Sequence, residues 1–381
     1  MNSKFLLASL LMLFSLNAFS QVSPQLENKI DSIVAHHLEI DKIIGFSVGI
    51  VKNGEVFFTK GYGTRTMGKE EPVDSLTNFL TCSISKLFTA TATMQLEEQG
   101  KIDLNERLIT YLPEFEMKDE RYKEITIHNL LTHTSGLPNF YKPNFIKPSH
   151  DSLALQMFAD KLKGKKLKFE PGVALSYETY SNTGYNILGL VIERITGRNY
   201  SEYMNQEVLQ PVGMTNSSFF YKEIPASRRS TPHKMNFITK KVKVADYYPD
   251  IPQDKPCGNL NSCSADLCKW MIHNLSLHHS DGSDEAIIKQ ETLQKMWTTK
   301  EKIEGFDTSI GLGWWIVDSK DYGKYLFHVG NDPGFSANLI VSPKNDFGIV
   351  VLCNGRYPRF EVWNDVPFEI IDLFEDEWKS E

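Results

Sequence analysis

Apolar residues near the start of the chain recur with the period of a helix. Ser23-Pro24 is typical of a helix start. The positions that follow at helical spacing are Leu26, Ile30, Ile33, His37 and Leu38. The next segment, GFSVGIVKNGEVFFTKGYG, has two apolar runs around Asn53-Gly54, which is a strong signal for a β-hairpin. The pattern therefore predicts helix, strand, strand as the first elements.

The remaining pattern changes twice along the chain. Residues 83–99 predict a helix that Gly100 stops, with an apolar stripe of Leu87, Ala90, Thr91 and Met94. From about 105 to 300, short helices and long loops are expected. Strand-like runs then return in GLGWWIVDS, KYLFHVG, SANLIVSP and FGIVVLCNG, the last two joined by a turn at Lys344-Asn345-Asp346. The segment VPFEIIDLFEDEW predicts a short amphipathic helix.

This distribution predicts the fold class. We expect an α/β fold, an α+β sandwich in which both chain ends form one antiparallel sheet flanked by helices. The sheet region covers about 21–104 and 305–381, and a mainly helical inserted region covers about 105–304. We expect residues 21–381 to form a single domain.

The first twenty residues are typical of a cleaved secretory signal. Lys4 precedes an apolar run, and Ala18-Phe19-Ser20 puts small residues before Gln21. A membrane anchor is the alternative, but the run is shorter than the ~20 residues that span a bilayer. We therefore expect signal peptide 1–20, a periplasmic or secreted protein, and no stable membrane span.

Charge and cysteine content narrow the expected partners. The net charge of −7 argues against nucleic acid, and we expect a monomer. Five cysteines cannot all pair with one another. A Cys257–Cys263 disulfide is an open alternative, but buried free thiols are the preferred interpretation.

Lys86 is the only charged side chain between Ser75 and Leu96. Ser83 lies three positions before it, so a helix would place both on one face. A serine hydroxyl is a weak nucleophile until a neighbouring base accepts its proton, and a lysine amine in an apolar setting can be that base. The S-x-x-K pattern alone is weak, because a surface lysine on an ordinary helix would also produce it.

Other candidate motifs carry less weight. GFSVG matches G-x-S-x-G, but Ser47 lies in a strand-like run without the helix that motif requires, so we interpret it as structural. His128 and His133 are five positions apart and diverge on a helix, and HExxH is absent. We expect packing or surface histidines, no metal site and no cofactor.

Two further stretches complete a pattern. Tyr180-Ser181-Asn182 forms a Y-x-N element before a predicted helix, and His328-Val329-Gly330 lies on a predicted strand. The order S-x-x-K, Y-x-N, (K/H)-x-G resembles the serine β-lactamase and penicillin-binding protein superfamily, especially the class C β-lactamase and D-alanyl-D-alanine carboxypeptidase branch. The stretch LLTHTSGLP and the first hairpin are also similar to that branch, and the resemblance covers roughly residues 24–355.

The resemblance implies a β-lactamase/transpeptidase-like domain and roles for matching positions. Ser83 would be the acylated nucleophile, Lys86 would share its proton, and Tyr180 would act as general base and then general acid. Asn182 would hold Lys86 and the substrate amide. The backbone N–H groups of Ser83 and Asn331, next to Gly330, would form the oxyanion hole, and His328 would face the substrate or its carboxylate.

Three features depart from the family pattern. His328 stands where many β-lactamases have lysine, and histidine is frequent there in carboxypeptidase-like and esterase-like members. Asn331-Asp332 replaces a glycine-rich pair, and the loop from Gly172 to Tyr180 is longer than expected. A second Y-x-N match at Tyr203 lacks the surrounding sequence and is rejected as catalytic.

The resemblance implies an exported serine hydrolase that forms an acyl-enzyme on D-alanyl peptides or β-lactams, with peptidoglycan among its candidate partners. A carboxylesterase or D-amino-acid amidase on the same site is the alternative enzyme. A non-catalytic sensor of wall fragments or β-lactams is an alternative of another class. A pure binder would not need the base Lys86 beside Ser83, which argues against the sensor.

Overall fold

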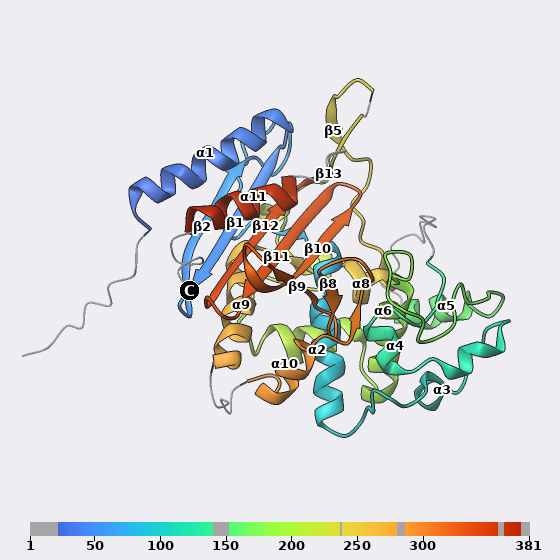
Figure 1. The fold of residues 1–381 in the computed structure, drawn as a ribbon. Coiled ribbons are helices and arrows are strands. Elements are labelled where there is room, and N and C mark those ends of the chain that lie inside the picture. Colours follow the sequence, from blue (N-terminus) through green and yellow to red (C-terminus); the bar gives the residue numbers. More distant parts are fainter. Residues whose placement is uncertain (1–21, 140–151, 237, 280–285, 357–361, 375–381) are drawn as a thin grey trace, which may run out of the picture.

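The chain forms an antiparallel sheet to which both of its ends contribute. This computed structural model describes residues 22–139, 152–236, 238–279, 286–356 and 362–374. The eight-stranded sheet has the order β2-β1-β12-β11-β10-β9-β8-β7 (Figure 1). Its strands are β1 Gly45–Lys52, β2 Glu55–Gly63, β7 Glu301–Lys302, β8 Thr308–Ile310, β9 Trp315–Ser319, β10 Gly323–Asp332, β11 Phe335–Ser342 and β12 Phe347–Cys353. The predicted fold class is confirmed.

The first hairpin forms because Asn53 and Gly54 both adopt positive φ values, 51° and 74°, as a type I′ turn requires. β1 lies between β2 and β12 and is buried along almost its whole length. Ser47 is inside this strand and donates a hydrogen bond to the Ser264 hydroxyl at 2.8 Å. The G-x-S-x-G match is therefore structural, as predicted.

Two helices cover the outer face of the sheet (Figure 1). They are α1 Pro24–Ile40 and α11 Val362–Ile371. The Ser23 hydroxyl accepts from the Leu26 N–H at 3.2 Å and caps α1, as its sequence predicts. Ile30, Val34 and Ile370 pack with sheet residues in one buried cluster. α11 begins before the predicted VPFEII segment, so Pro367 lies inside the helix rather than at its start.

The inner face carries α2 Ser85–Glu98 and α9 Ser264–His279. The predicted helix at 83–99 is present, preceded by a 3₁₀ turn over Cys82–Ile84. However, α2 is buried on all sides from Ser85 to Leu96 instead of along one stripe. The helix is buried all round because it lies between the sheet and the helical region.

The helical region supplies the other side of that sandwich. Its helices are α3 Leu108–Tyr111, α4 Ile127–Leu131, α5 Ala154–Asp160, α6 Asn182–Thr196, α7 Tyr200–Met204, α8 Lys255–Gly258 and α10 Gln290–Met296. Two small sheets also form, from β3 Phe79–Leu80 with β6 Asn261–Ser262, and from β13 Gly355–Arg356, β4 His233–Met235 and β5 Val242–Val244. Strands this short carry no periodic signal in the sequence.

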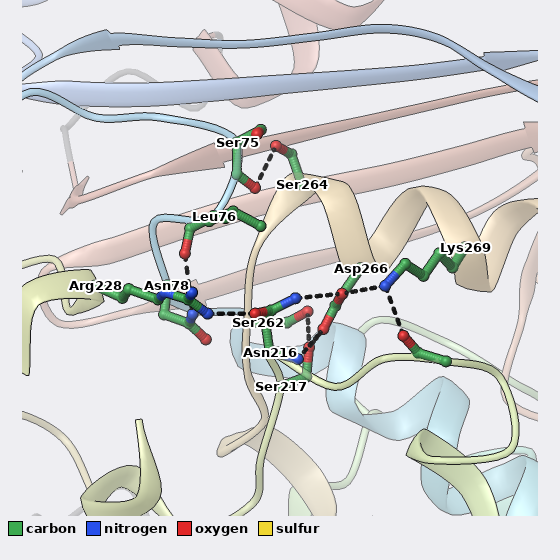
Figure 2. A network of polar contacts seen from close by, with 11 residues as sticks. Ser75, Leu76, Asn78, Asn216, Ser217, Arg228, Ser262, Ser264, Asp266 and Lys269 are labelled. Carbon is green, nitrogen blue, oxygen red and sulfur yellow. Dashed lines mark hydrogen bonds and ion pairs between the residues drawn. The ribbon is translucent and has the colours of Figure 1, made fainter. Parts of the chain in front are cut away.

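A buried carboxylate joins the two regions. Asp266, in the first turn of α9, accepts hydrogen bonds from the Asn216 N–H at 2.7 Å and the Ser217 hydroxyl at 2.8 Å. Lys269 also donates to it at 3.0 Å (Figure 2). Since Asp266 is fully buried, these bonds replace the water that its charge has lost. They fix the loop around residue 216 against α9.

All five cysteines are buried and none forms a disulfide, which confirms the preferred interpretation over a Cys257–Cys263 bond. Within the described part of the chain, no helix is both long and apolar enough to cross a membrane. The predicted signal peptide, residues 1–20, lies outside the described residues.

Candidate active site

Ser83 lies on a tight turn that leads directly into α2. Cys82 precedes it with φ 51°, a left-handed conformation that is uncommon outside glycine. The hydroxyl of Ser85 stabilises this turn, since it donates to the Cys82 carbonyl at 2.7 Å and accepts from the Leu260 N–H at 2.9 Å. Ser83 is therefore presented from a constrained backbone at the start of the central helix.

Lys86 points back to Ser83. Its Nζ donates to Ser83 Oγ at 3.0 Å and to the Cys257 carbonyl of α8 at 2.6 Å. The side chain is fully buried, so these contacts hold the amine in one place. The isolated lysine of the sequence is thus an interior group within hydrogen-bond range of the serine.

Tyr180 and Asn182 enter the same site from the start of α6. The amine of Lys86 lies 5.1 Å from the centre of the Tyr180 ring. Asn182 is the first residue of α6, and its Oδ1 is buried without a hydrogen-bond partner in the described chain. Of the described residues, Ser83 and Cys257 accept from Lys86 and Asn182 does not. The expected Lys86–Asn182 bond is thus not formed in this structure.

Asn139 fixes the Y-x-N element and was missed by the sequence analysis. Its Nδ2 donates to the Tyr180 carbonyl at 2.6 Å, and its Oδ1 accepts from the Asn182 N–H at 2.8 Å. A single amide therefore positions both functional residues. It follows directly after the LLTHTSGLP stretch, but the sequence alone does not show that this stretch meets α6.

His133 packs directly on Tyr180, with ring centres 4.3 Å apart. The Ser181 N–H donates to its Nδ1 at 3.1 Å, so the proton of the neutral ring is on Nε2. Nε2 is buried and has no partner among the described residues. Burial, with Lys86 next in importance, keeps the pKa of His133 well below its usual value. The packing role expected for this histidine is present, but its partner is a candidate catalytic residue.

His328 lies on β10, on the same face as Gly330. Its Nδ1 donates to the Val329 carbonyl at 2.8 Å, and its Nε2 is buried without a partner in the described chain. Burial and the nearby Lys86 lower the pKa of His328 to about 3. The ring is therefore neutral near pH 7, and its Nε2 carries a lone pair. A lone pair cannot donate to a carboxylate, so a carboxylate contact does not fit this geometry.

Gly330 brings β10 against the nucleophile turn. A Cβ at this position would lie 2.3 Å from the Thr81 carbonyl oxygen and 3.1 Å from the Ser83 backbone nitrogen. Only glycine allows this close approach. Asn331 follows, with its Oδ1 buried and unpartnered among described residues. The Gly330 backbone is thus close to the Ser83 backbone nitrogen.

The arrangement brings together groups from α2, α6, α8 and β10 that are far apart in the sequence. The second Y-x-N match is elsewhere, since Tyr203 in α7 is buried and its hydroxyl donates to Gln95 at 3.4 Å. Among the described residues, no three His, Cys, Asp or Glu side chains are placed to hold a metal ion. The chemistry that these groups support is acyl transfer to a serine.

The comparison with protein families agrees with this geometry. A family model described as Beta-lactamase matches residues 30–369. The chain belongs to the beta-lactamase family. This confirms the superfamily resemblance that the three motifs indicated.

Two solved structures show the same fold. A mutant class C beta-lactamase superposes with a TM-score of 0.76 at 20% identity, covering 93% of this chain and 99% of that chain. The D-alanine carboxypeptidase AmpC from Burkholderia cenocepacia gives 0.73 at 20% identity, covering 92% and 99%. At these identities the likeness concerns the fold.

A curated relative is closer in sequence. Protein flp of Staphylococcus aureus (strain NCTC 8325 / PS 47) is 28% identical over 329 residues. The match covers 86% of this chain and 63% of the relative, so the chain spans less than two thirds of that protein's length.

Proposed function

We propose that this beta-lactamase family member is a serine hydrolase that works through an acyl-enzyme on Ser83. The observation that carries the proposal is the 3.0 Å hydrogen bond between Lys86 Nζ and Ser83 Oγ inside a buried site. A pure binding protein has no need of a fixed amine against a serine hydroxyl. The Lys86–Ser83 contact therefore argues against a non-catalytic sensor.

The proposed reaction has two steps. Ser83 Oγ attacks the substrate carbonyl carbon, its proton passes to Lys86 or Tyr180, and the N–H groups of Ser83 and Asn331 bind the oxyanion. The bond to the leaving group then breaks, and Tyr180 returns a proton to that group. Water hydrolyses the ester on Ser83 with the same groups in reversed roles, and Asn182 orients the substrate amide.

The first proposed substrate class consists of D-alanyl peptides and the β-lactams that mimic them. A second candidate, a carboxylesterase or amidase, is favoured by a specific observation. His328 is neutral and has a lone pair on Nε2, so it offers no positive charge to a substrate carboxylate. Substrates without a carboxylate at that position fit this feature better. Export rests on the signal-like pattern of residues 1–20.

The decisive experiment is intact-mass measurement after incubation with a penicillin or a p-nitrophenyl ester. We expect a Ser83-linked acyl adduct or Ser83-dependent turnover, and at least about a thousandfold loss of kcat/KM in Ser83→Ala, since removal of a nucleophile abolishes the covalent route. A persistent penicillin adduct favours the peptidase, rapid penicillin turnover favours the lactamase, and ester cleavage alone favours the esterase.

Ser47→Ala is the matched control, because it removes the serine of the G-x-S-x-G match inside β1. We expect it to keep the adduct. Adduct formation that survives in Ser83→Ala would contradict the proposal. Full-affinity penicillin binding by Ser83→Ala, with no turnover of any acyl substrate, would support the sensor instead.

A further inference from the structure

Two exposed aromatic side chains touch each other at the β7–β8 end of the sheet. Tyr177 is 62% exposed and Phe306 is 57% exposed. Their ring centres are 5.5 Å apart and nearly perpendicular, at 86°. The other large hydrophobic side chains exposed in the described chain are aliphatic: Ile40, Val56, Met67, Leu153, Met157, Ile238 and Val244. Single exposed apolar residues are ordinary, but a contacting aromatic pair offers a ligand a larger apolar surface than one ring does.

The pair is anchored beside the candidate active site. A tight turn holds Tyr177 three residues before Tyr180, because Thr179 Oγ1 donates to the Ser176 carbonyl at 2.9 Å. Phe306 lies in the turn between β7 and β8, where its N–H donates to the Ile303 carbonyl at 3.1 Å. Ile303 and Tyr180 belong to the same hydrophobic cluster. Each ring of the aromatic pair is thus three residues along the chain from a member of this cluster, Tyr177 from Tyr180 and Phe306 from Ile303.

Carboxylates are close to the pair in the sequence. Glu178 follows Tyr177, and Glu304 and Asp307 flank Phe306 in the sequence. All three are exposed, and none forms an ion pair with another described residue. Lys302 is the one basic residue in segments 175–180 and 301–308. Acidic residues therefore outnumber basic ones in these two segments, even with the adjacent Lys300 counted, which favours a negative local potential.

We propose that Tyr177 and Phe306 form a subsite for an apolar segment of the acyl group, remote from the reacting carbonyl. The neighbouring carboxylates select segments that end in an ammonium group over those that end in a carboxylate. This inference rests on the proposed acyl-enzyme function of Ser83 and adds the substrate class that the site accepts.

The chemistry of the two rings fits such a segment. Methylene groups that cover the rings leave water, and a terminal ammonium can approach a ring face and the carboxylates together. A terminal carboxylate would be repelled by Glu178, Glu304 and Asp307.

The test uses four p-nitrophenyl esters with the full chain: acetate, hexanoate, 6-aminohexanoate and the hexanedioate monoester. Tyr177→Ala and Phe306→Ala should each lower the hexanoate-to-acetate ratio of kcat/KM by about three- to tenfold, since a buried methylene contributes ~0.8 kcal/mol. Both substitutions should raise KM more than they lower kcat, because the rings contact the acyl chain equally in the bound substrate and in the transition state. Val56→Ala, on edge strand β2 at the other side of the sheet, is the matched control.

A second set of variants tests the charge. The wild-type protein should have a higher kcat/KM for the 6-aminohexanoate ester than for the hexanedioate ester. A triple variant that combines Glu178→Gln, Glu304→Gln and Asp307→Asn should lower that ratio about three- to tenfold. Added salt should lower it in the wild type, since exposed charges are screened. Glu55→Gln, next to Val56, is the charge control.

Each outcome decides between the two claims. Ser83-dependent hydrolysis whose chain-length ratio is the same in Tyr177→Ala, Phe306→Ala and Val56→Ala would overturn the subsite and leave the proposed function standing. A preference for hexanedioate would overturn the charge selection. If penicillin acylates Ser83 but no ester is hydrolysed in a Ser83-dependent way, the subsite is overturned and the proposed function stands. If neither penicillin nor any ester reacts in a Ser83-dependent way, the proposed function fails, and the subsite fails with it.

Discussion

Burial keeps both imidazoles near Ser83 uncharged. The pKa of His328 falls to about 3 because the ring is desolvated and lies near Lys86. The pKa of His133 is lowered by the same two causes, in the same order. The two rings have opposite tautomers. His133 Nδ1 accepts from the Ser181 N–H, so its Nε2 carries the proton, whereas His328 Nδ1 donates to the Val329 carbonyl, so its Nε2 carries a lone pair. The site thus combines one amine, Lys86, with two neutral rings.

The neutral ring of His328 makes stability depend on pH. Its folded pKa is below the ordinary value of 6.5, so its contribution is fully present above pH 6.5 and is lost as pH falls toward about 3. Between pH 7 and pH 5, the unfolding free energy of the wild type should fall by about 2 kcal/mol more than that of His328→Gln. Urea denaturation at several pH values measures this difference.

His36→Gln is the control for this prediction, since His36 is an exposed histidine on α1. An equal effect of the two substitutions on the pH slope would show that His328 is not held neutral by its burial.

At the scale of elements, polar contacts determine how the helical region meets the sheet layer. Helix α9 lies against β1 and β12, and its first turn carries Asp266. The carboxylate binds the backbone and side chains of the 216–217 loop (Figure 2). The same helix start reaches β1, because Ser264 accepts from Ser47. One helix end therefore connects the sheet with a loop of the helical region.

Asp266→Ala should lower the free energy of unfolding by about 2–4 kcal/mol, since it leaves a buried N–H and a hydroxyl without their acceptor. The control is Asp160→Ala, which removes another aspartate that pairs with a lysine three positions later, but on the surface at 3.5 Å. Exposed pairs contribute ~0–1 kcal/mol. Chemical denaturation of both variants is the measurement. Equal losses would show that the buried network does not hold the loop.

At the scale of the whole molecule, the sheet separates two hydrophobic clusters. Ile30 of α1 belongs to the outer cluster and Ile84, beside Ser83, to the inner one. Both side chains are fully buried. The candidate active site lies with the inner cluster, between the sheet and the helical region. Stability and activity should therefore respond differently to the same substitution on the two faces.

Ile30→Ala and Ile84→Ala should each cost about 2–5 kcal/mol of unfolding free energy, because each leaves a cavity. Below the melting temperature, Ile30→Ala should acylate Ser83 within about twofold of wild type, whereas Ile84→Ala should acylate about tenfold or more slowly, since small displacements at a reacting group are costly. Time-resolved intact mass with an ester substrate measures both rates. Equal acylation rates for the two variants would contradict this separation of the faces.

Much of this protein follows from its sequence because the signals are local. Asn53-Gly54 closes the first hairpin, Ser23 caps α1, and Ser83 and Lys86 meet because one helical turn separates them. The Y-x-N element precedes a helix and His328 lies on a strand, as predicted. Periodicity of 3.6 or 2 and turn chemistry act over a few residues, so a single chain segment contains them.

The tertiary structure alone decided which distant groups meet. The Cys257 carbonyl binds Lys86, Asn139 fixes the backbone of Tyr180, and His133 packs against its ring. No local pattern contains these contacts, because they depend on the packing of α4, α6 and α8 around α2. The charge state of His328 was also beyond the sequence, since desolvation depends on what surrounds the ring after folding. The sequence determined which reactive groups are present, and the fold determined their partners, protonation and access to substrate.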